Sequence, residues 1–314
     1  MDDQAALKRY LAEEMVEEYQ EGRLSRRTMI KTVAQILGVA IVGPALLSSL
    51  GDTAHAHGRE PEIDLPEVAP VPSEQTQGVT VPEDDPAITV RSIELPGEAS
   101  LIKAYLARPK GKGRYPTVVI IHENRGLTEH NRDVARRFAK TGYIALAVDL
   151  LSRLGGTEKF ATTPEATAAI GTLLPGDVIA DLRSSVTWLR TRSYVRKGQM
   201  AAIGWCWGGG MAWRLATAEK RLGAVAAFYG PNPPLEAVPN IRAAVLGIYG
   251  GEDARITGGI EGLDKALKEA DITHEMKVYA GAKHAFFNDT GANFHPTAAW
   301  EAWTKTLEWF EEYL

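Results

Sequence analysis

The sequence predicts an α/β fold: a doubly wound, mostly parallel sheet with helices on both faces. Short apolar runs, such as residues 118–121, alternate with longer segments of helical periodicity from residue 88 to the C-terminus. A continuous apolar run is typical of a strand that is covered on both faces. The length of 314 residues accommodates one such domain, which commonly runs to about 250 residues, together with a separate leading segment.

The predicted elements follow one another in a regular order. Residues 88–95 and 99–108 predict two strands joined by a turn at Pro96-Gly97, which is typical of an antiparallel hairpin. The remaining predicted elements are strands at 118–121, 143–148, 200–203, 223–228, 243–249 and 274–279, and helices at 129–141, 177–193, 259–270 and 297–313. Because ligands of such sheets bind outside the carboxyl ends of the strands, we expect the functional residues there.

The charge and the cysteine content narrow the class of protein. The formal net charge is −5, and the chain has no block of basic residues. Proteins that bind nucleic acid usually carry a clustered Lys/Arg patch, so this composition argues against that class. Cys206 is the single cysteine, which excludes an intramolecular disulfide. A lone cysteine is either a small buried hydrophobe or a reactive thiol, and its neighbours decide between the two.

Residues 1–56 predict an export segment of the twin-arginine type. Residues 2–24 are acidic and helix-prone, and Ser25-Arg26-Arg27-Thr28-Met29-Ile30-Lys31 follows them. A largely uncharged stretch at 32–51 and the sequence Ala54-His55-Ala56 complete the segment. A charged start, an apolar middle and an A-x-A end are the parts of an export signal. We therefore expect a periplasmic or exported protein that uses the twin-arginine export machinery and meets the membrane only in passing.

The leading segment has an alternative interpretation as an uncleaved helix that packs on the domain or sits in a membrane. Met29 and Ile30 replace the Phe and Leu that are customary in the twin-arginine motif. The apolar stretch is about long enough to span a bilayer, although Gly38 and Pro44 dilute it. On this alternative, the protein is membrane-anchored or cytoplasmic.

Residues 57–86 predict an acidic, proline-rich linker ahead of a domain at 87–314. The prolines of this segment are Pro61, Pro66, Pro70, Pro72, Pro82 and Pro86. Proline lacks the N–H that sheets and helices need, and such a composition cannot bury a core. We expect an extended chain here.

Cys206 is the predicted nucleophile. Gly204-Trp205-Cys206-Trp207-Gly208-Gly209 follows a predicted strand and opens a helix, which is the nucleophile-elbow arrangement with cysteine in place of the usual serine. Only glycine tolerates the close approach two residues before and two residues after the nucleophile. A helix N-terminus that points at the sulfur favours the thiolate. The alternative is a small buried residue beside a helix start.

The acid and the base of the predicted triad lie in loops after later strands. In this arrangement the acid follows the nucleophile and the histidine follows the acid. Asp253 comes directly after the strand 243–249, and His284 comes after the strand 274–279. Glu252 is the competing acid, with a solvated surface charge as its alternative interpretation.

The loop after the strand 118–121 completes the predicted site. The backbone N–H groups of Asn124 and Trp207 are the predicted oxyanion hole. Glu123 stands in the same loop, where a carboxylate is hard to explain as structure because an unpaired buried charge is costly. Candidates for an apolar pocket, of which Tyr229 is the predicted substrate-binding residue, are Trp205, Trp207, Phe228, Tyr229 and Phe286. Their alternative is plain core.

Over roughly residues 88–314, these motifs resemble the dienelactone hydrolase (carboxymethylenebutenolidase) family of the α/β-hydrolase superfamily. The resemblance rests on Glu123, Gly-x-Cys-x-Gly-Gly around Cys206, Asp253 and His284-Ala285-Phe286. It implies an α/β-hydrolase fold and a Cys-His-Asp triad. It also implies that the Glu123 carboxylate accepts a hydrogen bond from the resting thiol and swings away when substrate arrives.

The resemblance also suggests a substrate anchor. Asp149-Leu150-Leu151-Ser152-Arg153 matches the family's D-L-x-x-R, whose arginine binds the substrate carboxylate. Arg153 is therefore a candidate anchor, with an ordinary surface arginine as the alternative. The family's dienelactone cleavers carry a second arginine four residues after the histidine, where this chain has Asn288. The sequence therefore does not predict dienelactone itself as the substrate.

Together these observations predict an enzyme that hydrolyses a carboxylic ester or lactone, a small molecule, through a thioester acyl-enzyme. Cys206 attacks the carbonyl, His284 transfers protons, and Asp253 orients the imidazole. We expect neither a metal nor a cofactor, because the nucleophile and the base supply the chemistry. The alternatives are an acyltransferase or thioesterase on the same triad and, from another class, a non-catalytic binding protein that keeps the fold. The natural substrate and the oligomeric state do not follow from the sequence.

Overall fold

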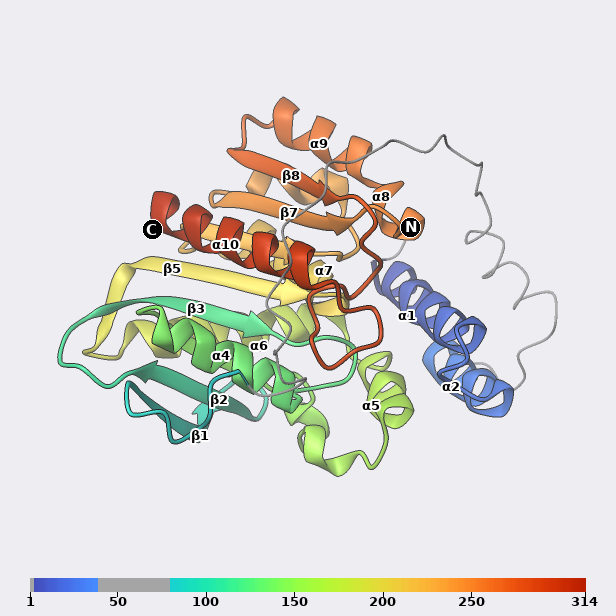
Figure 1. The fold of residues 1–314 in the computed structure, drawn as a ribbon, viewed down its shortest axis with the longest axis horizontal. Coiled ribbons are helices and arrows are strands. Elements are labelled where there is room, and N and C mark those ends of the chain that lie inside the picture. The colour runs from blue at the N-terminus through green and yellow to red at the C-terminus, as the bar shows by residue number, and fades with distance from the viewer. Residues whose placement is uncertain (1–2, 39–79) are drawn as a thin grey trace.

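The computed structural model describes residues 3–38 and 80–314, and its centre is an eight-stranded sheet (Figure 1). The strands are β1 (Ile88–Pro96), β2 (Leu101–Pro109), β3 (Tyr115–Ile121), β4 (Ile144–Val148), β5 (Val195–Trp205), β6 (Ala224–Phe228), β7 (Ala244–Gly250) and β8 (His274–Tyr279). They lie side by side in the order β1-β2-β4-β3-β5-β6-β7-β8. The β1–β2 and β2–β4 pairs are antiparallel and all other pairs are parallel, which confirms the predicted sheet and hairpin.

Helices cover both faces of the sheet. The helices of the domain are α4 (Glu129–Lys140), α5 (Thr163–Ile170), α6 (Pro175–Arg190), α7 (Trp207–Ala218), α8 (Ala254–Thr257), α9 (Ile260–Glu269) and α10 (Pro296–Tyr313). The ring of Phe138 in α4 lies 4.5 Å from that of Trp303 and 6.1 Å from that of Phe310, so α4 and α10 share one face. The contacting pair α6 and α7 covers the other face (Figure 1).

Burial explains why these segments are strands. Every residue of β4 and β6 is buried, because helices pack on both faces of the central sheet. β3 and β5 begin earlier than predicted, at Tyr115 and Val195. Several of the first residues of these strands are polar or partly exposed, so the buried apolar run is shorter than the strand. α5 was not predicted; Thr162 caps its N-terminus by accepting a hydrogen bond from the Glu165 N–H at 3.4 Å.

The strand order places the functional loops at one edge. β3 lies between β4 and β5, so the chain direction across the sheet reverses at β3. A crevice opens at such a switch point, outside the carboxyl ends of the strands. The loops that follow β3, β5, β7 and β8 all emerge at this edge, and they carry Glu123, Cys206, Asp253 and His284.

Two N-terminal helices pack against the same edge (Figure 1). They are α1 (Asp3–Gln20) and α2 (Arg26–Leu37), and α2 contacts α5. One face of α1 is buried through Leu7, Leu11 and Met15, which follow one another at intervals of four residues. The described part of the leading segment is therefore packed on the domain, as its alternative interpretation expects. Residues 39–56, with Ala54-His55-Ala56, lie outside the described residues, so export stays a prediction.

The beginning of the domain and its helices complete the fold. Residues 57–79 of the predicted linker lie outside the described residues. From residue 80 onward the chain is packed, since Val81 is buried and its N–H donates to Asp133 Oδ1 at 2.7 Å. The packed chain thus begins before the predicted boundary at residue 87. Among the helices of residues 3–38 and 80–314, none is long and apolar enough to cross a membrane.

Candidate active site

Cys206 lies in a strained turn between β5 and α7. Its φ of 56° and ψ of −124° are rare for a residue with a side chain. A Cβ on Gly204 would lie 2.1 Å from the Gly208 carbonyl oxygen, and a Cβ on Gly208 would lie 2.2 Å from that of His122. Glycine is therefore required at both positions, as the elbow predicts. The turn places the thiol at the carboxyl edge of the sheet.

Asp253 and His284 meet Cys206 from the loops after β7 and β8. The Nδ1 of His284 donates to Asp253 Oδ2 at 2.5 Å, and both side chains are buried. Nε2 therefore faces the thiol; the ligand atoms of His284, Cys206 and Glu14 all lie within 4.8 Å of one another. The competing acid, Glu252, is exposed. The fold thus brings the three predicted triad residues together.

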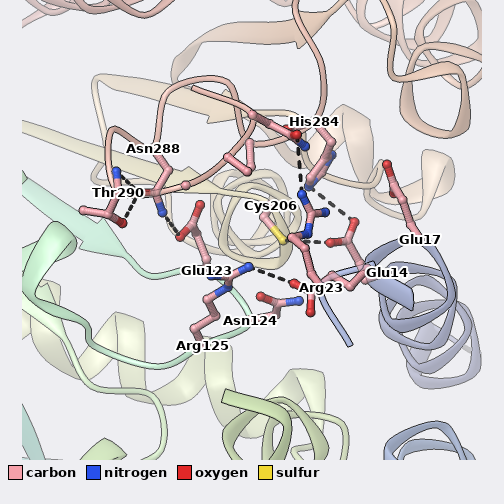
Figure 2. Close-up of a pocket in the computed structure, with 15 residues that line it drawn as sticks. Glu14, Glu17, Arg23, Glu123, Asn124, Arg125, Cys206, His284, Asn288 and Thr290 are labelled. Carbon is pink, nitrogen blue, oxygen red and sulfur yellow. Dashed lines mark hydrogen bonds and ion pairs between the residues drawn. The ribbon is translucent and has the colours of Figure 1, made fainter. Parts of the chain in front are cut away.

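The second predicted carboxylate, Glu123, is held by an amide. Its Oε2 accepts a hydrogen bond from Asn288 Nδ2 at 2.8 Å, as Figure 2 shows. Asn288 is itself fixed, since its Oδ1 accepts from the N–H of Thr290 at 3.0 Å and from its hydroxyl at 2.6 Å. The thiol points to another carboxylate, with its Sγ 3.9 Å from Glu14 Oε2. The implied hydrogen bond between the thiol and Glu123 stays a prediction.

The two residues of the predicted oxyanion hole follow β3 and β5, and Asn124 lines the cavity at Cys206. Trp207 is the first residue of α7, where backbone N–H groups have no partner within the helix. The loop that carries Asn124 is fixed by Thr167, whose hydroxyl donates to the Asn124 carbonyl at 2.8 Å. His122 also fixes this loop: its Nε2 accepts from the Leu150 N–H at 3.1 Å, so its Nδ1 donates to the Glu123 carbonyl at 2.6 Å.

Neither of the two predicted substrate-binding residues lines the cavity at Cys206. Arg153 forms a bidentate pair with Asp181, with Nε–Oδ2 and Nη2–Oδ1 distances of 2.8 and 2.9 Å, and it does not line the cavity at Cys206. Tyr229 is fully buried and packs edge-on against His284, with ring centroids 4.9 Å apart. Tyr229 therefore packs against the imidazole ring of His284. A substrate role for either residue stays a prediction.

A cavity of about 230 Å³ opens beside Cys206 and His284 (Figure 2). The domain contributes Glu123, Asn124, Arg125, Cys206, His284, Ala285, Asn288, Thr290, Gly291, Ala292 and Asn293 to its wall. The N-terminal segment contributes Glu14, Glu17, Glu18 and Arg23. The leading segment therefore forms one wall of the site.

Tyr10 and Glu14 of α1 reach the catalytic atoms, which the sequence did not predict. The Tyr10 hydroxyl donates to Cys206 Sγ at 3.2 Å and lies 3.4 Å from His284 Nε2. Glu14 Oε1 lies 3.3 Å from the same Nε2. One feature of the sequence indicates this contact. The spacing of Leu7, Tyr10, Leu11 and Met15 in an acidic helix is typical of a helix with one face packed on protein.

These neighbours change the protonation of the triad. Burial alone would lower the pKa of His284, but the carboxylates of Glu14 and Asp253 outweigh it and hold this pKa well above its usual value. Burial, then Glu14, raises the pKa of the Cys206 thiol. Burial would raise the pKa of Glu14, but Arg255 and His284 lower it to about 2. These shifts favour a neutral thiol, an imidazolium and an ionised Glu14.

Glu14, Cys206 and His284 are also the side chains that, within the described residues, lie close enough together to hold a metal ion. Glutamate, thiolate and imidazole are the ligand types that zinc uses. The Glu14 carboxylate, however, is already bound by the Arg255 guanidinium. A metal ion would have to compete with that buried cation for the same oxygen atoms.

The model of the dienelactone hydrolase family matches residues 102–314, which include Glu123, Cys206, Asp253 and His284. The chain belongs to the dienelactone hydrolase family. It is therefore a hydrolase that acts on small-molecule esters or lactones, as the sequence resemblance implied. α1 and α2 precede the residues that the family model matches.

Similar proteins agree with this membership. The "Putative carboxymethylenebutenolidase" of Salmonella typhimurium is 34% identical over 242 residues, which cover 73% of this chain and 89% of the relative. The protein of the same name from Methylorubrum extorquens is 29% identical over 246 residues, covering 74% and 84%. The crystal structure of the "Putative Dienelactone Hydrolase" from Klebsiella pneumoniae has a TM-score of 0.68 and 32% identity, covering 72% of this chain and 100% of that one.

The α/β-hydrolase fold extends to more distant structures. The acylaminoacyl peptidase of Pyrococcus horikoshii has a TM-score of 0.59 at 15% identity and is similar to 74% of this chain, over 43% of its own. A likeness at this level of identity shows the fold alone. It confirms the predicted fold class.

Proposed function

We propose that the chain hydrolyses its ester or lactone through a Cys206-His284-Asp253 triad and a thioester acyl-enzyme. The observation that supports this most directly is the 2.5 Å bond between His284 and Asp253 beside a thiol on a strained elbow. The relatives' name, carboxymethylenebutenolidase, names a butenolide, which is a lactone, as their substrate. We therefore include lactones in the substrate class.

In the acylation step, His284 Nε2 removes the thiol proton and the thiolate attacks the carbonyl carbon. The backbone N–H groups of Asn124 and Trp207 stabilise the oxyanion of the tetrahedral intermediate. His284 then donates its proton to the leaving alkoxide oxygen, and the carbon–oxygen bond breaks. The products of this step are the free alcohol, or the opened ring of a lactone, and a thioester on Cys206.

In the deacylation step, a water molecule takes the place of the leaving group. His284 removes a proton from this water, which attacks the thioester, and the Cys206 sulfur leaves with the returned proton. Asp253 keeps the imidazole in the tautomer that has its proton on Nδ1, and stabilises the imidazolium that forms in each step. Both steps need free space next to Nε2.

The single cysteine allows a direct test of the covalent intermediate. The full chain is mixed with a p-nitrophenyl ester, quenched in acid and examined by mass spectrometry for an acyl group on Cys206. We expect this adduct, with release of free acid, and we expect Cys206→Ala to lose at least a thousandfold in kcat/KM. An active Cys206→Ala variant, or acid release without any adduct at Cys206, would contradict the mechanism.

The location of the protein remains a proposal from the sequence. Arg26 and Arg27, the two arginines of the export motif, are exposed at the start of α2. This exposure leaves the pair accessible to the twin-arginine export machinery. We propose export on the strength of the sequence motif alone.

A further inference from the structure

The Tyr10 hydroxyl occupies the position that the reaction needs. A leaving-group oxygen, and later the hydrolytic water, must each lie within hydrogen-bond reach of His284 Nε2 beside the sulfur. The Tyr10 oxygen lies there, 3.2 Å from Cys206 Sγ and 3.4 Å from Nε2, and its side chain is buried. While this hydroxyl is present, it competes with the leaving-group oxygen and with the hydrolytic water for the position next to Nε2.

Glu14 acts on the same atoms through charge. Its carboxylate lies 3.3 Å from Nε2 of His284 and stabilises the imidazolium, which cannot accept the thiol proton. The same carboxylate adds to burial in raising the pKa of the Cys206 thiol. With α1 docked, the imidazolium of His284 cannot take up the thiol proton and the thiol is harder to ionise, so the first proton transfer of acylation is disfavoured. Figure 2 shows Glu14 next to both Cys206 and His284.

Charge complementarity holds α1 in this place. Three arginines of the domain bind four carboxylates of α1: Arg214 binds Asp3, Arg125 binds Glu18, and Arg255 binds Glu14 and Glu17. The Arg214 Nε–Asp3 Oδ2 and Arg125 Nη2–Glu18 Oε1 distances are 2.9 and 2.8 Å. An anionic ligand could bind the same arginines through its own carboxylate and would then compete with α1.

Arg255 is the arginine at the triad. It follows Asp253 by two residues, and its Nη2 binds Glu14. Its side chain is 13% exposed with α1 in place, and its Nη1 is buried without a hydrogen-bond partner. When α1 leaves, this guanidinium loses the carboxylates of Glu14 and Glu17, and its N–H groups are free to bind another anion where the Glu14 carboxylate now lies, 3.3 Å from His284 Nε2. Arg153, in contrast, keeps its own partner in Asp181.

We propose that α1 occupies the active site as a tethered substrate mimic, and that Arg255, which binds the Glu14 carboxylate, binds the anionic group of the ester or lactone once α1 has left. This inference rests on the proposed function and names its substrate class. A substrate that competes with α1 has to replace both the hydroxyl at the reacting position and the carboxylate on Arg255. An ester or lactone with a carboxylate close to the cleaved bond does so.

The test compares two arginines that both hold α1. Arg214→Gln removes the contact to Asp3, and Arg255→Gln removes the contacts to Glu14 and Glu17, but only Arg255 binds a carboxylate that also contacts His284. Each full-length variant, together with Glu14→Gln, is assayed with p-nitrophenyl butyrate and with the mono-p-nitrophenyl ester of glutaric acid. These acyl groups are of similar length and differ by a carboxylate.

The expected pattern separates the two roles. Arg214→Gln and Glu14→Gln should raise kcat/KM for both esters by at least threefold and leave their ratio unchanged. Arg255→Gln should raise kcat/KM for the neutral ester and lower the acidic-to-neutral ratio by about tenfold or more, the factor for a lost charged hydrogen bond. Lower activity of Arg214→Gln on both esters would show that α1 is a working part of the site. An unchanged ratio in Arg255→Gln would remove Arg255 as the anchor.

Two further measurements do not depend on turnover, so failure of the proposed hydrolysis remains distinguishable. Iodoacetamide should alkylate Cys206, the single thiol, at least threefold faster in Arg214→Gln than in the parent chain, since Arg214 does not contact the thiol and acts through docking. Glutarate should bind Arg214→Gln at least tenfold more tightly than Arg214→Gln/Arg255→Gln in calorimetry. Equal alkylation rates would overturn the docked mimic, and equal affinities would overturn the anchor, whether or not any ester is cleaved.

Discussion

Cys206 is surrounded by groups that disfavour its thiolate. Burial has the largest effect, and the carboxylates of Glu14 and Glu123 add to it, while His284 opposes them. In the proposed mechanism the thiolate is the nucleophile, so its reactivity depends on how these neighbours are arranged. Of the two carboxylates, Glu14 raises the thiol pKa more than Glu123 does. Protection of the resting thiol is therefore shared between α1 and the domain.

Removal of the Glu123 charge should make the thiol easier to ionise. We expect Glu123→Gln to be alkylated by iodoacetamide faster than the parent chain near neutral pH, even if ester turnover falls. Glu123→Asp, which keeps the charge, is the matched control and should stay closer to the parent rate. Slower alkylation of Glu123→Gln across the pH range would show that Glu123 helps to ionise the thiol.

Arg153 offers a second test at the scale of one residue. Its partner Asp181 is buried, so Arg153→Ala should lower the free energy of unfolding by about 1–3 kcal/mol, the cost of an unpaired buried charge. We expect kcat/KM to change by the same factor for acidic and neutral esters. A loss confined to acidic esters would instead make Arg153 the carboxylate anchor that the sequence resemblance implies. Denaturant unfolding and the two-ester assay measure these effects.

At the scale of elements, α1 differs from every other helix that reaches the site. The strands and helices of the domain carry the triad residues in their own loops. α1 carries none of them and contacts the triad only through the side chains of Tyr10 and Glu14. Its buried face carries Leu7, Leu11 and Met15 together with the carboxylates of Glu14 and Glu18, which bind arginines of the domain. Because at least one partner of each of these ion pairs is buried, we expect a rise in ionic strength to weaken the docking only slightly.

The docking of α1 should depend on pH through the Glu14–His284 pair. The pKa of His284 is raised in the folded state, so its contribution is present below the usual histidine pKa and is lost as the pH rises through the raised value. The pKa of Glu14 is lowered to about 2, so its contribution is present above the usual value of 4.5 and is lost as the pH falls toward 2. The pair therefore stabilises the docked state between these limits.

Thermal unfolding of Glu14→Gln and the parent chain measures this dependence. The difference in Tm should be largest between about pH 5 and the raised His284 pKa, and it should shrink on either side. Asp3→Asn serves as a control, because it removes an α1 contact that does not involve a histidine. A difference that persists as the pH rises through the raised His284 pKa would show that Glu14 stabilises α1 through Arg255 and not through His284.

At the scale of the whole molecule, the leading segment has two proposed roles. In the structure α1 lies in the active site, and α2 begins with the arginine pair of the export motif. If the chain is cut after Ala56 during export, α1 is removed together with the signal. The proposed substrate mimic would then act on the precursor and be absent from the exported enzyme.

Substitution of the arginine pair tests the export proposal. Arg26→Lys with Arg27→Lys should leave the precursor in the cytoplasm, because the pair is the recognition element of the motif. Both side chains are exposed at the start of α2, so the change should leave the packing of the helix intact. Fractionation and the mass of the chain in each compartment give the result. An unchanged periplasmic fraction would mean that the segment is not a twin-arginine signal.

The sequence by itself determined the fold of the domain and the three residues of the proposed triad. Short apolar runs that alternate with helical segments indicate buried strands, and the tight elbow at Cys206 requires the two glycines that the sequence places around it. Asp253 and His284 follow from their position just after strands whose carboxyl ends must meet at one edge. These features are local, or follow from a regular topology, so the chain order reveals them.

The tertiary structure decided what faces the triad. Tyr10 and Glu14 lie 196 and 270 residues from the catalytic side chains that they contact, Cys206 and His284 respectively. Asn288 bound to Glu123, and Arg153 bound to Asp181, depend in the same way on which loops pack together. A side chain's partner across such distances is set by the packing of whole elements, which spacing along the chain does not encode. For this reason the sequence predicted the reacting groups, whereas only the fold placed α1 over them.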